Sequence, residues 1–131
     1  MDPMEQLELL KAAIAVALAD GELRRSEMGV IKGLAARVGV GKASLDAMLE
    51  AAQTDDSIAD NMLMSSKKSA TEAIELLVAQ ARIDGHISDE ERNVLVRIAC
   101  SLGITGAAFD TVYTAGIDRA DAIRKSRYGS P

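Results

Sequence analysis

The chain reads ALADGELRRSE at residues 17–27 and ARIDGHISDEE at residues 81–91. Both stretches follow the pattern A-x-x-D-G-x-[LI]-x-x-x-E, so that Ala17 corresponds to Ala81 and Glu27 to Glu91. In each case an apolar segment with helical periodicity precedes the Asp-Gly pair and another follows it, which predicts two helices joined by a tight turn. The pattern therefore predicts a helical hairpin that occurs twice.

The repeat extends well beyond this hairpin. In the same register, residues 8–52 align with residues 72–116 without a gap, and twelve of the 45 pairs are identical. A unit of three short helices is too small to bury its apolar faces alone, so we expect the two units to pack together with approximate two-fold symmetry. The units are predicted at about residues 5–52 and 69–116.

Helical spacing of apolar residues continues through nearly the whole chain, and no stretch alternates long enough to predict a sheet. Helices are predicted over about residues 3–20, 25–38, 42–53, 70–84 and 89–102, from Thr105 onward and over 118–127, with a short helix in a polar linker at 53–68. Capping boxes are expected at Asp2 with Glu5, Ser69 with Glu72 and Ser88 with Glu91. The predicted fold is all-α: one domain over residues 1–131, a bundle of about seven or eight helices built from two pseudo-symmetric three-helix repeats.

Composition excludes several classes of function. A net charge of −5, from 20 acidic and 15 basic residues, argues against nucleic acid as the partner. One cysteine and one histidine exclude thiolate-rich and two-histidine metal sites, and we expect Cys100 to be a small buried residue. The longest apolar run, residues 12–19, is far shorter than the roughly 20 residues that span a bilayer. The N-terminus is acidic, unlike a signal peptide, so we expect a cytoplasmic protein without a membrane span.

The acids of the repeated hairpin are the candidate functional residues. Asp20 and Asp84 fall at the predicted C-termini of helices, where the helix dipole disfavours negative charge, so each needs a compensating partner. Together with Glu27 and Glu91 they offer four carboxylates, which predicts an oxygen-only site for Ca²⁺, Mg²⁺ or Mn²⁺, with Zn²⁺ less favoured. The spacing matches only the second half of an EF-hand loop, because the first half lacks carboxylates, and an EF-hand is therefore rejected.

A metal-free interpretation fits the same residues. Glu91 is the third helical residue of a capping box, and Glu27 lies in a first helical turn, where acids are stabilised. Arg24, Arg25 and Arg92 are the nearby candidates for salt bridges. In this case the chain is a helical protein–protein interaction module.

The doubled motif, Asp20-Gly21 with Glu27 and Asp84-Gly85 with Glu91, resembles the TerB-like family. That family includes tellurite-resistance proteins and the N-terminal region of DjlA-type co-chaperones. The resemblance covers roughly residues 5–116 and implies an all-α fold and a metal-binding role for these four acids. It also implies a bacterial stress response and action in protein complexes, without a catalytic reaction. The first hairpin departs from the second in lacking a counterpart of the Ser88 cap, and we expect neither a J-domain nor a membrane anchor.

We therefore expect a non-enzymatic TerB-like stress-response domain that acts with a protein partner, and homo-oligomerisation is an open alternative. An enzyme is less favoured, because the motifs assemble no serine, cysteine or histidine triad and no glycine-rich phosphate loop. Four acids with a metal could hydrolyse phosphoesters only if they line a deep pocket.

Overall fold

The computed structural model describes residues 2–21, 23–55, 62–83 and 85–127, and these ranges hold six helices and no strand. The helices are α1 (Pro3–Ala17), α2 (Arg25–Arg37), α3 (Lys42–Ala52), α4 (Lys67–Ala81), α5 (Asp89–Ser101) and α6 (Gly106–Arg127). The all-α prediction is confirmed. In the ranges above, no helix combines the length and the apolar character that crossing a membrane requires.

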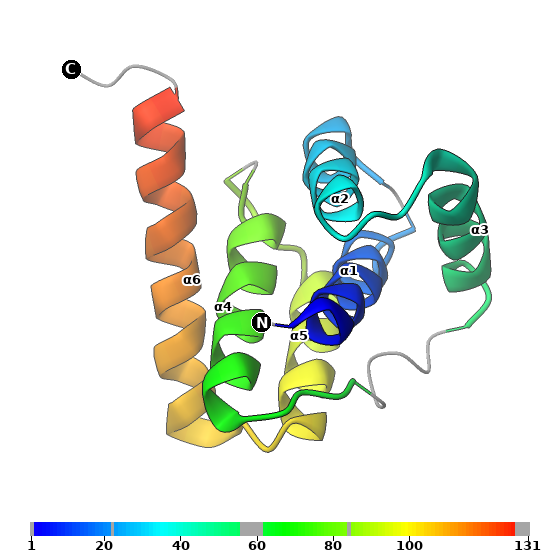
Figure 1. Cartoon of the computed structure of the whole chain (residues 1–131). Helices are drawn as coiled ribbons and strands as arrows, with labels where there is room; N and C mark the ends of the chain where they lie inside the picture. The colour runs from blue at the N-terminus through cyan, green and yellow to red at the C-terminus, as the bar shows by residue number, and fades with distance from the viewer. Residues whose placement is uncertain (1, 22, 56–61, 84, 128–131) are drawn as a thin grey trace.

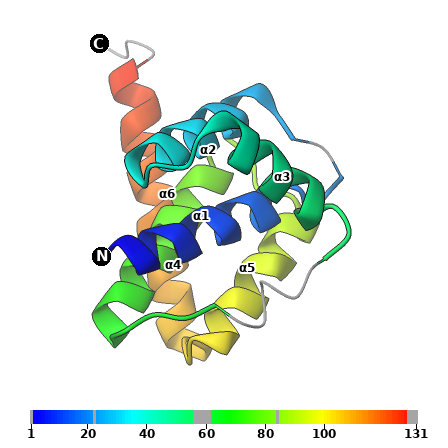
Figure 2. The ribbon, with the colours of Figure 1, turned by 45° about the vertical axis from the view of Figure 1, so that its right-hand side comes forward.

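Helix α1 lies at the centre of the arrangement. It contacts α2, α3, α4 and α5, whereas α4 contacts α1, α2 and α5 and has its most extensive contact with α6 (Figure 1). In the rotated view α2 and α3 lie on one side of α1, and α4 and α5 lie on the other (Figure 2). The two hairpins, α1–α2 and α4–α5, thus pack against each other through their first helices.

The helix bounds repeat in the register of the sequence. In the alignment that pairs Ala17 with Ala81, α4 begins and ends at the equivalents of the α1 bounds, α5 matches α2 in the same way, and α6 begins at the equivalent of the start of α3. Buried positions repeat too, as at Ile14 and Val78. Each helix contact of one half also has a counterpart in the other, since α1·α2 matches α4·α5 and α1·α5 matches α4·α2.

Two of the three predicted capping boxes are confirmed. The Asp2 carboxylate accepts from the N–H of Glu5 at 2.8 Å, and Ser88 Oγ accepts from the N–H of Glu91 at 3.1 Å. The box at Ser69 is wrong, because α4 begins at Lys67 and is capped by Ser66, whose Oγ accepts from the N–H of Ser69 at 3.1 Å. Helix α4 therefore begins at residue 67, three residues before the start predicted at about residue 70.

The separate C-terminal helix predicted at residues 118–127 is wrong. One helix, α6, runs through Gly106–Arg127, and this lowers the expected count by one, while the short linker helix falls largely outside the described residues. Gly116 does not end the helix but lets it approach α4, since a Cβ there would lie 2.6 Å from the Val78 side chain. Ion pairs then hold the second half of α6 on α4, between Arg119 and Glu75 and between Asp121 and Arg82.

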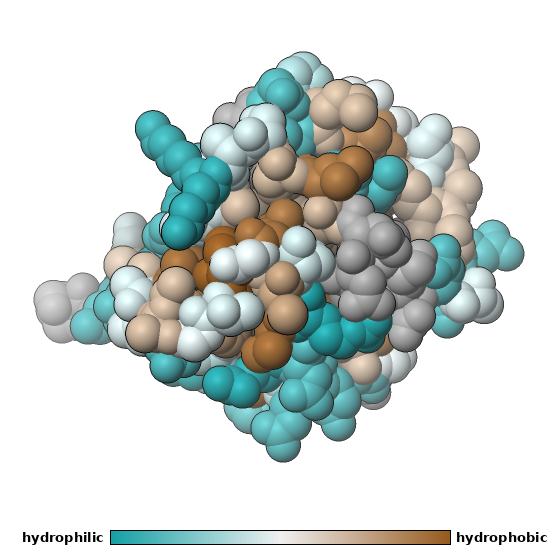
Figure 3. Space-filling view, turned by 90° about the horizontal axis from the view of Figure 1, so that it is seen from below, coloured by the Kyte–Doolittle hydropathy of each residue, from teal (hydrophilic) through white to brown (hydrophobic). Residues whose placement is uncertain are grey.

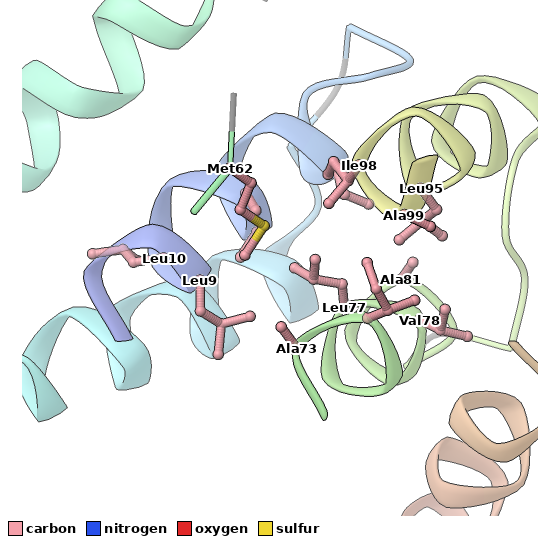
Figure 4. Close-up of a cluster of buried hydrophobic side chains, with 14 of the residues drawn as sticks. Leu9, Leu10, Met62, Ala73, Leu77, Val78, Ala81, Leu95, Ile98 and Ala99 are labelled. Atoms are coloured by element: carbon pink, nitrogen blue, oxygen red, sulfur yellow. The ribbon is translucent and has the colours of Figure 1, made fainter. Parts of the chain in front are cut away.

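The core is shared by both halves. Side chains of α1, α4 and α5 point into one interior, and Met62 lies over α1 (Figure 4). The fully buried large apolar residues come from α1, α2, α4 and α5: Leu10, Ile14, Val16, Ile31, Ile74, Leu77, Val78, Leu95 and Ile98. At roughly 1.5–3 kcal/mol for each large side chain, this burial is the main stabilising contribution.

The segment before α4 is tied to the start of α1. The buried Glu5 carboxylate accepts hydrogen bonds from the N–H and Oγ of Ser65, at 2.9 and 3.0 Å. These bonds and that from the N–H of Asp2 lower the pKa of Glu5 to about 2. The short helix expected in the linker falls largely on residues 56–61, outside the described residues, and residues 62–64 are not helical.

Two predictions about single residues are also corrected. Cys100, expected to be buried, is exposed on α5, as is its repeat equivalent Ala36 on α2. Helix α1 ends at Ala17, so Asp20 lies in the following turn and not in the last helical turn.

The surface also carries exposed apolar residues. Met4 and Leu63 are 72% and 70% exposed, and both line a shallow hollow with the acidic Asp2, Glu5 and Glu8. Seen from below, the molecule shows hydrophobic atoms grouped between hydrophilic ones (Figure 3).

Candidate functional site

The glutamates of the repeated motif occupy the same place in their two helices. Glu27 is the third residue of α2 and Glu91 the third residue of α5, and their side chains are 1% and 0% exposed. Glu27 Oε1 accepts from the N–H of Arg24 at 3.2 Å, and Glu91 Oε1 accepts from the N–H of Ser88 at 2.9 Å. Each carboxyl group therefore caps its own helix with one oxygen.

The turn before each helix makes this placement possible. Gly21 and Gly85 have φ angles of +83° and +93°, in the left-handed region that favours glycine, and they reverse the chain after α1 and α4. Arg24 at the start of α2 offers no side-chain cap, in agreement with the arginine that stands here at the position equivalent to Ser88. Glu27 alone caps the first helix, whereas Ser88 and Glu91 cap the second together.

The carboxyl groups of Glu27 and Glu91 approach each other across the interface between the repeats, since one oxygen of each lies beside the same nitrogen, Arg24 Nη1. Burial, first, and the Glu91 carboxyl group, second, raise the pKa of Glu27 from 4.5 to about 7. Glu27 Oε2 and Glu91 Oε2 are buried, and neither accepts from an N–H or O–H group in the described ranges. A carboxylate offers only acceptors, so such a contact needs either a shared proton or a cation.

Arg24 links the acids of both repeats. Its Nη2 donates to Asp20 Oδ2 at 3.3 Å, while its Nη1 lies 3.9 Å from Glu27 Oε1 and 3.7 Å from Glu91 Oε1. The Arg24 side chain is 32% exposed and that of Asp20 is 15% exposed, so both lie at the edge of the buried pair. Arg24 thus balances part of the negative charge that three acids bring together.

The remaining predicted residues have different positions. Asp84 lies outside the described residues, so its place relative to the other three acids stays a prediction. Of the candidate salt-bridge partners, Arg24 contacts the acids as expected, Arg25 is exposed, and Arg92 lies over the ring of Tyr113 at 5.5 Å. The second hairpin is contacted by α6 instead, with the Arg124 guanidinium directly beside Gly85.

One buried polar residue of the core was not predicted. Gln80 on α4 is 5% exposed, and its Nε2 donates to the Ala13 carbonyl oxygen of α1 at 3.2 Å, while its Oε1 is buried without a donor in the described ranges. Its repeat equivalent is Val16. In the sequence, a glutamine at a core-facing position between Leu77 and Ala81 could have indicated this buried polar contact.

The donors suit a hard divalent cation better than a soft one. Glu27, Glu91 and Asp20 provide only oxygen atoms, the ligands that Mg²⁺, Ca²⁺ and Mn²⁺ prefer, and two of those oxygens are buried and unpaired. In the described ranges, histidine, cysteine, aspartate and glutamate do not form a group of three in a metal-binding arrangement. Within those ranges the candidate site therefore consists of Glu27 and Glu91. Asp20 is connected to these two glutamates through Arg24, which contacts all three acids.

Comparison with known proteins adds no relative to this picture. No protein-family model, curated protein or solved structure matches the chain. The resemblance to the TerB-like family therefore stays a prediction from the doubled motif.

Proposed function

We propose that this chain is a non-enzymatic TerB-like stress-response domain that binds one divalent cation between its repeats and acts in a protein complex. The observation that carries the proposal is the placement of two fully buried carboxyl groups, Glu27 and Glu91, beside the same Arg24 nitrogen, with outer oxygens that lack donors in the described ranges. Asp20 and Asp84 complete the proposed ligand set, and Ca²⁺, Mg²⁺ or Mn²⁺ is the expected ion.

Charge balance permits a cation at this place. Without a cation, Arg24 and one shared proton offset the charges of Asp20, Glu27 and Glu91. A divalent ion would replace the proton and release Arg24, whose partly exposed side chain can move into solvent. Because Glu27 and Glu91 belong to different repeats, the ion would fix the position of one hairpin against the other.

The pairing of the two halves is part of the proposal. We take them as pseudo-symmetric repeats, which the repeated helix bounds and the matching helix contacts support. In such an arrangement the two glutamates meet at the pseudo-symmetry axis, the natural position for a single shared ion.

A catalytic role is less favoured on physical grounds. A carboxyl group that acts as general acid or base must reach the substrate, and Glu27 and Glu91 are at most 1% exposed. Their burial suits a structural ion or a shared proton better than hydrolysis.

A second candidate function rests on Arg24. Its contacts with Asp20, Glu27 and Glu91 give each acid a cationic neighbour without any metal. In this case the domain is a metal-free interaction module whose acids cap helices and form ion pairs.

A cation titration distinguishes the two candidates. Amide NMR shifts are recorded at neutral pH while Ca²⁺, Mg²⁺, Mn²⁺ or Zn²⁺ is added to wild-type protein, Asp20→Asn and Glu27→Gln/Glu91→Gln. Saturable shifts around residues 20–27 and 85–91, lost in the double variant and weakened in Asp20→Asn, are expected for the cation site. Asp46→Asn is the matched control, because Asp46 is an exposed acid paired with Lys42 on α3. If these amides do not respond at millimolar cation, the metal-free module replaces the cation proposal.

A further inference from the structure

The two repeats differ most in the way their third helices pack. In α6 the aromatic rings of Phe109 and Tyr113 lie 5.6 Å apart, with Arg92 of α5 over Tyr113. The equivalent residues of the first repeat are the smaller Leu45 and Leu49 of α3 and Met28 of α2. Helix α3 buries only Leu45.

This difference leaves an apolar groove between α2 and α3. The groove has a volume of about 430 Å³ and is lined by Met28, Ala35, Ala36, Val40, Leu45 and Leu49. Lys32, Lys42 and Asp46 form its rim, and Lys42 pairs with Asp46 at 2.9 Å. Its volume and apolar lining are those of a site that accepts large apolar side chains.

The exposed charges that α2 contributes are of one sign, whereas α3 contributes the paired Lys42 and Asp46. Helix α2 carries three exposed charged residues, Arg25, Lys32 and Arg37, all basic, while its one acid, Glu27, is buried. Arg25 and Lys32 are seven residues apart, so they lie on one face about 10 Å from each other along the helix. In a chain with a net charge of −5, this face favours an acidic partner.

The exposed side of α2 beyond the groove is open. Gly29 and Gly33 lie in the middle of the helix without lining the groove themselves, and a Cβ at either position would meet nothing within 4 Å. Glycine destabilises a helix interior, and no contact within the described residues requires it here. The repeat equivalents are Asn93 and Arg97, so the open face belongs to the first repeat alone.

From these observations we propose that the α2–α3 groove docks an acidic amphipathic helix of a partner protein. An aromatic or large aliphatic anchor of that helix fills the groove, its backbone approaches α2 at Gly29 and Gly33, and acidic residues two turns apart meet Arg25 and Lys32. A small ligand would fill the groove without using the glycines or both basic residues. The proposal deepens the protein-complex part of the proposed function and is independent of the cation.

The test uses a synthetic probe in the presence of a chelator. The probe is a labelled helical peptide of about 20 residues with phenylalanine and leucine four residues apart and glutamates two turns apart beside them. Its twin carries lysines in place of these glutamates. Saturable binding of the acidic peptide, with amide shifts at the groove and affinity about tenfold above that of the twin, is expected. Arg25→Glu/Lys32→Glu should reverse this preference.

A matched pair of variants tests the close approach. Gly33→Leu should weaken binding about tenfold, whereas Asn93→Leu, at an exposed position of the same kind on α5, should leave it unchanged. Equal affinity for both peptides, shifts away from the groove or equal effects of the two leucine variants would overturn the proposal. So would concentration-dependent shifts at the groove without peptide, because the occupant would then be a second copy of the chain. Because chelator is present, none of these results depends on the cation site.

Discussion

Replacing Glu27 with glutamine should remove most of the pH dependence of stability between about pH 4.5 and pH 7. Glutamine has the shape of the protonated acid: its oxygen can accept from the N–H of Arg24, and its amide group can donate to Glu91 in place of the shared proton. The Glu27→Gln variant therefore keeps the contact with Glu91 but has no ionisable group at position 27.

The direction of this pH dependence follows from the pKa values of Glu27 in the folded and unfolded states. The pKa is about 7 in the folded protein and 4.5 for the unperturbed group, so the folded state holds this proton more tightly. The resulting stabilisation is complete below about pH 4.5 and is lost as the pH rises through about 7. A change of this size corresponds to about 3 kcal/mol of unfolding free energy.

The assay is urea unfolding in chelator from about pH 4 to pH 8. Across this range the free energy of unfolding of the wild-type protein should fall by up to about 3 kcal/mol relative to that of Glu27→Gln. The pH dependence that Glu5 contributes is common to both proteins and cancels in this comparison. Glu50→Gln, at an exposed position of α3, controls for the change in net charge. Parallel curves for wild type and Glu27→Gln would refute the buried shared proton.

Three further predictions concern the scaffold. Ser65→Ala should raise the pKa of Glu5 only slightly above about 2, because the bond from Ser65 Oγ is removed while the bond from the backbone N–H, the largest cause of the shift, remains. Carboxyl NMR titration of both proteins measures this change. Gly116→Ala should destabilise the fold by about 1–3 kcal/mol, because the added Cβ would overlap with α4. Gly33→Ala should instead stabilise the fold by about 0.5–1 kcal/mol, because alanine favours a helix interior and nothing lies near the added Cβ. Urea unfolding measures both changes. Cys100 should react with a thiol reagent in native protein as completely as in unfolded protein, and protection of the thiol would contradict its exposed position.

Much of the fold could be predicted from local pattern. The Asp2 and Ser88 caps and the helical spacing of apolar residues locate the helices, since these signals act within a few residues. The errors arise where packing decides. Gly116 resembles a helix end in the sequence, but its missing side chain instead allows α6 to contact α4.

The candidate site was predictable in part. The repeated motif selects Glu27 and Glu91, and the structure places both beside Arg24. The sequence could not show that Arg24 reaches across to Glu91, because that contact depends on how two distant hairpins pack. The bond between Glu5 and Ser65 is of the same non-local kind, as it joins residues 60 positions apart.

The most direct test of the cation site is a count of protons released on binding. Wild-type protein at about pH 6 is mixed with Mg²⁺, Ca²⁺ or Mn²⁺ in weak buffer with an indicator dye, and Glu27→Gln serves as the reference. A cation between Glu27 and Glu91 should release close to one proton per bound ion, and the release should fall toward zero above about pH 8, where Glu27 is already ionised. Binding without proton release, or no binding to the wild-type protein, would contradict a cation shared by the two glutamates.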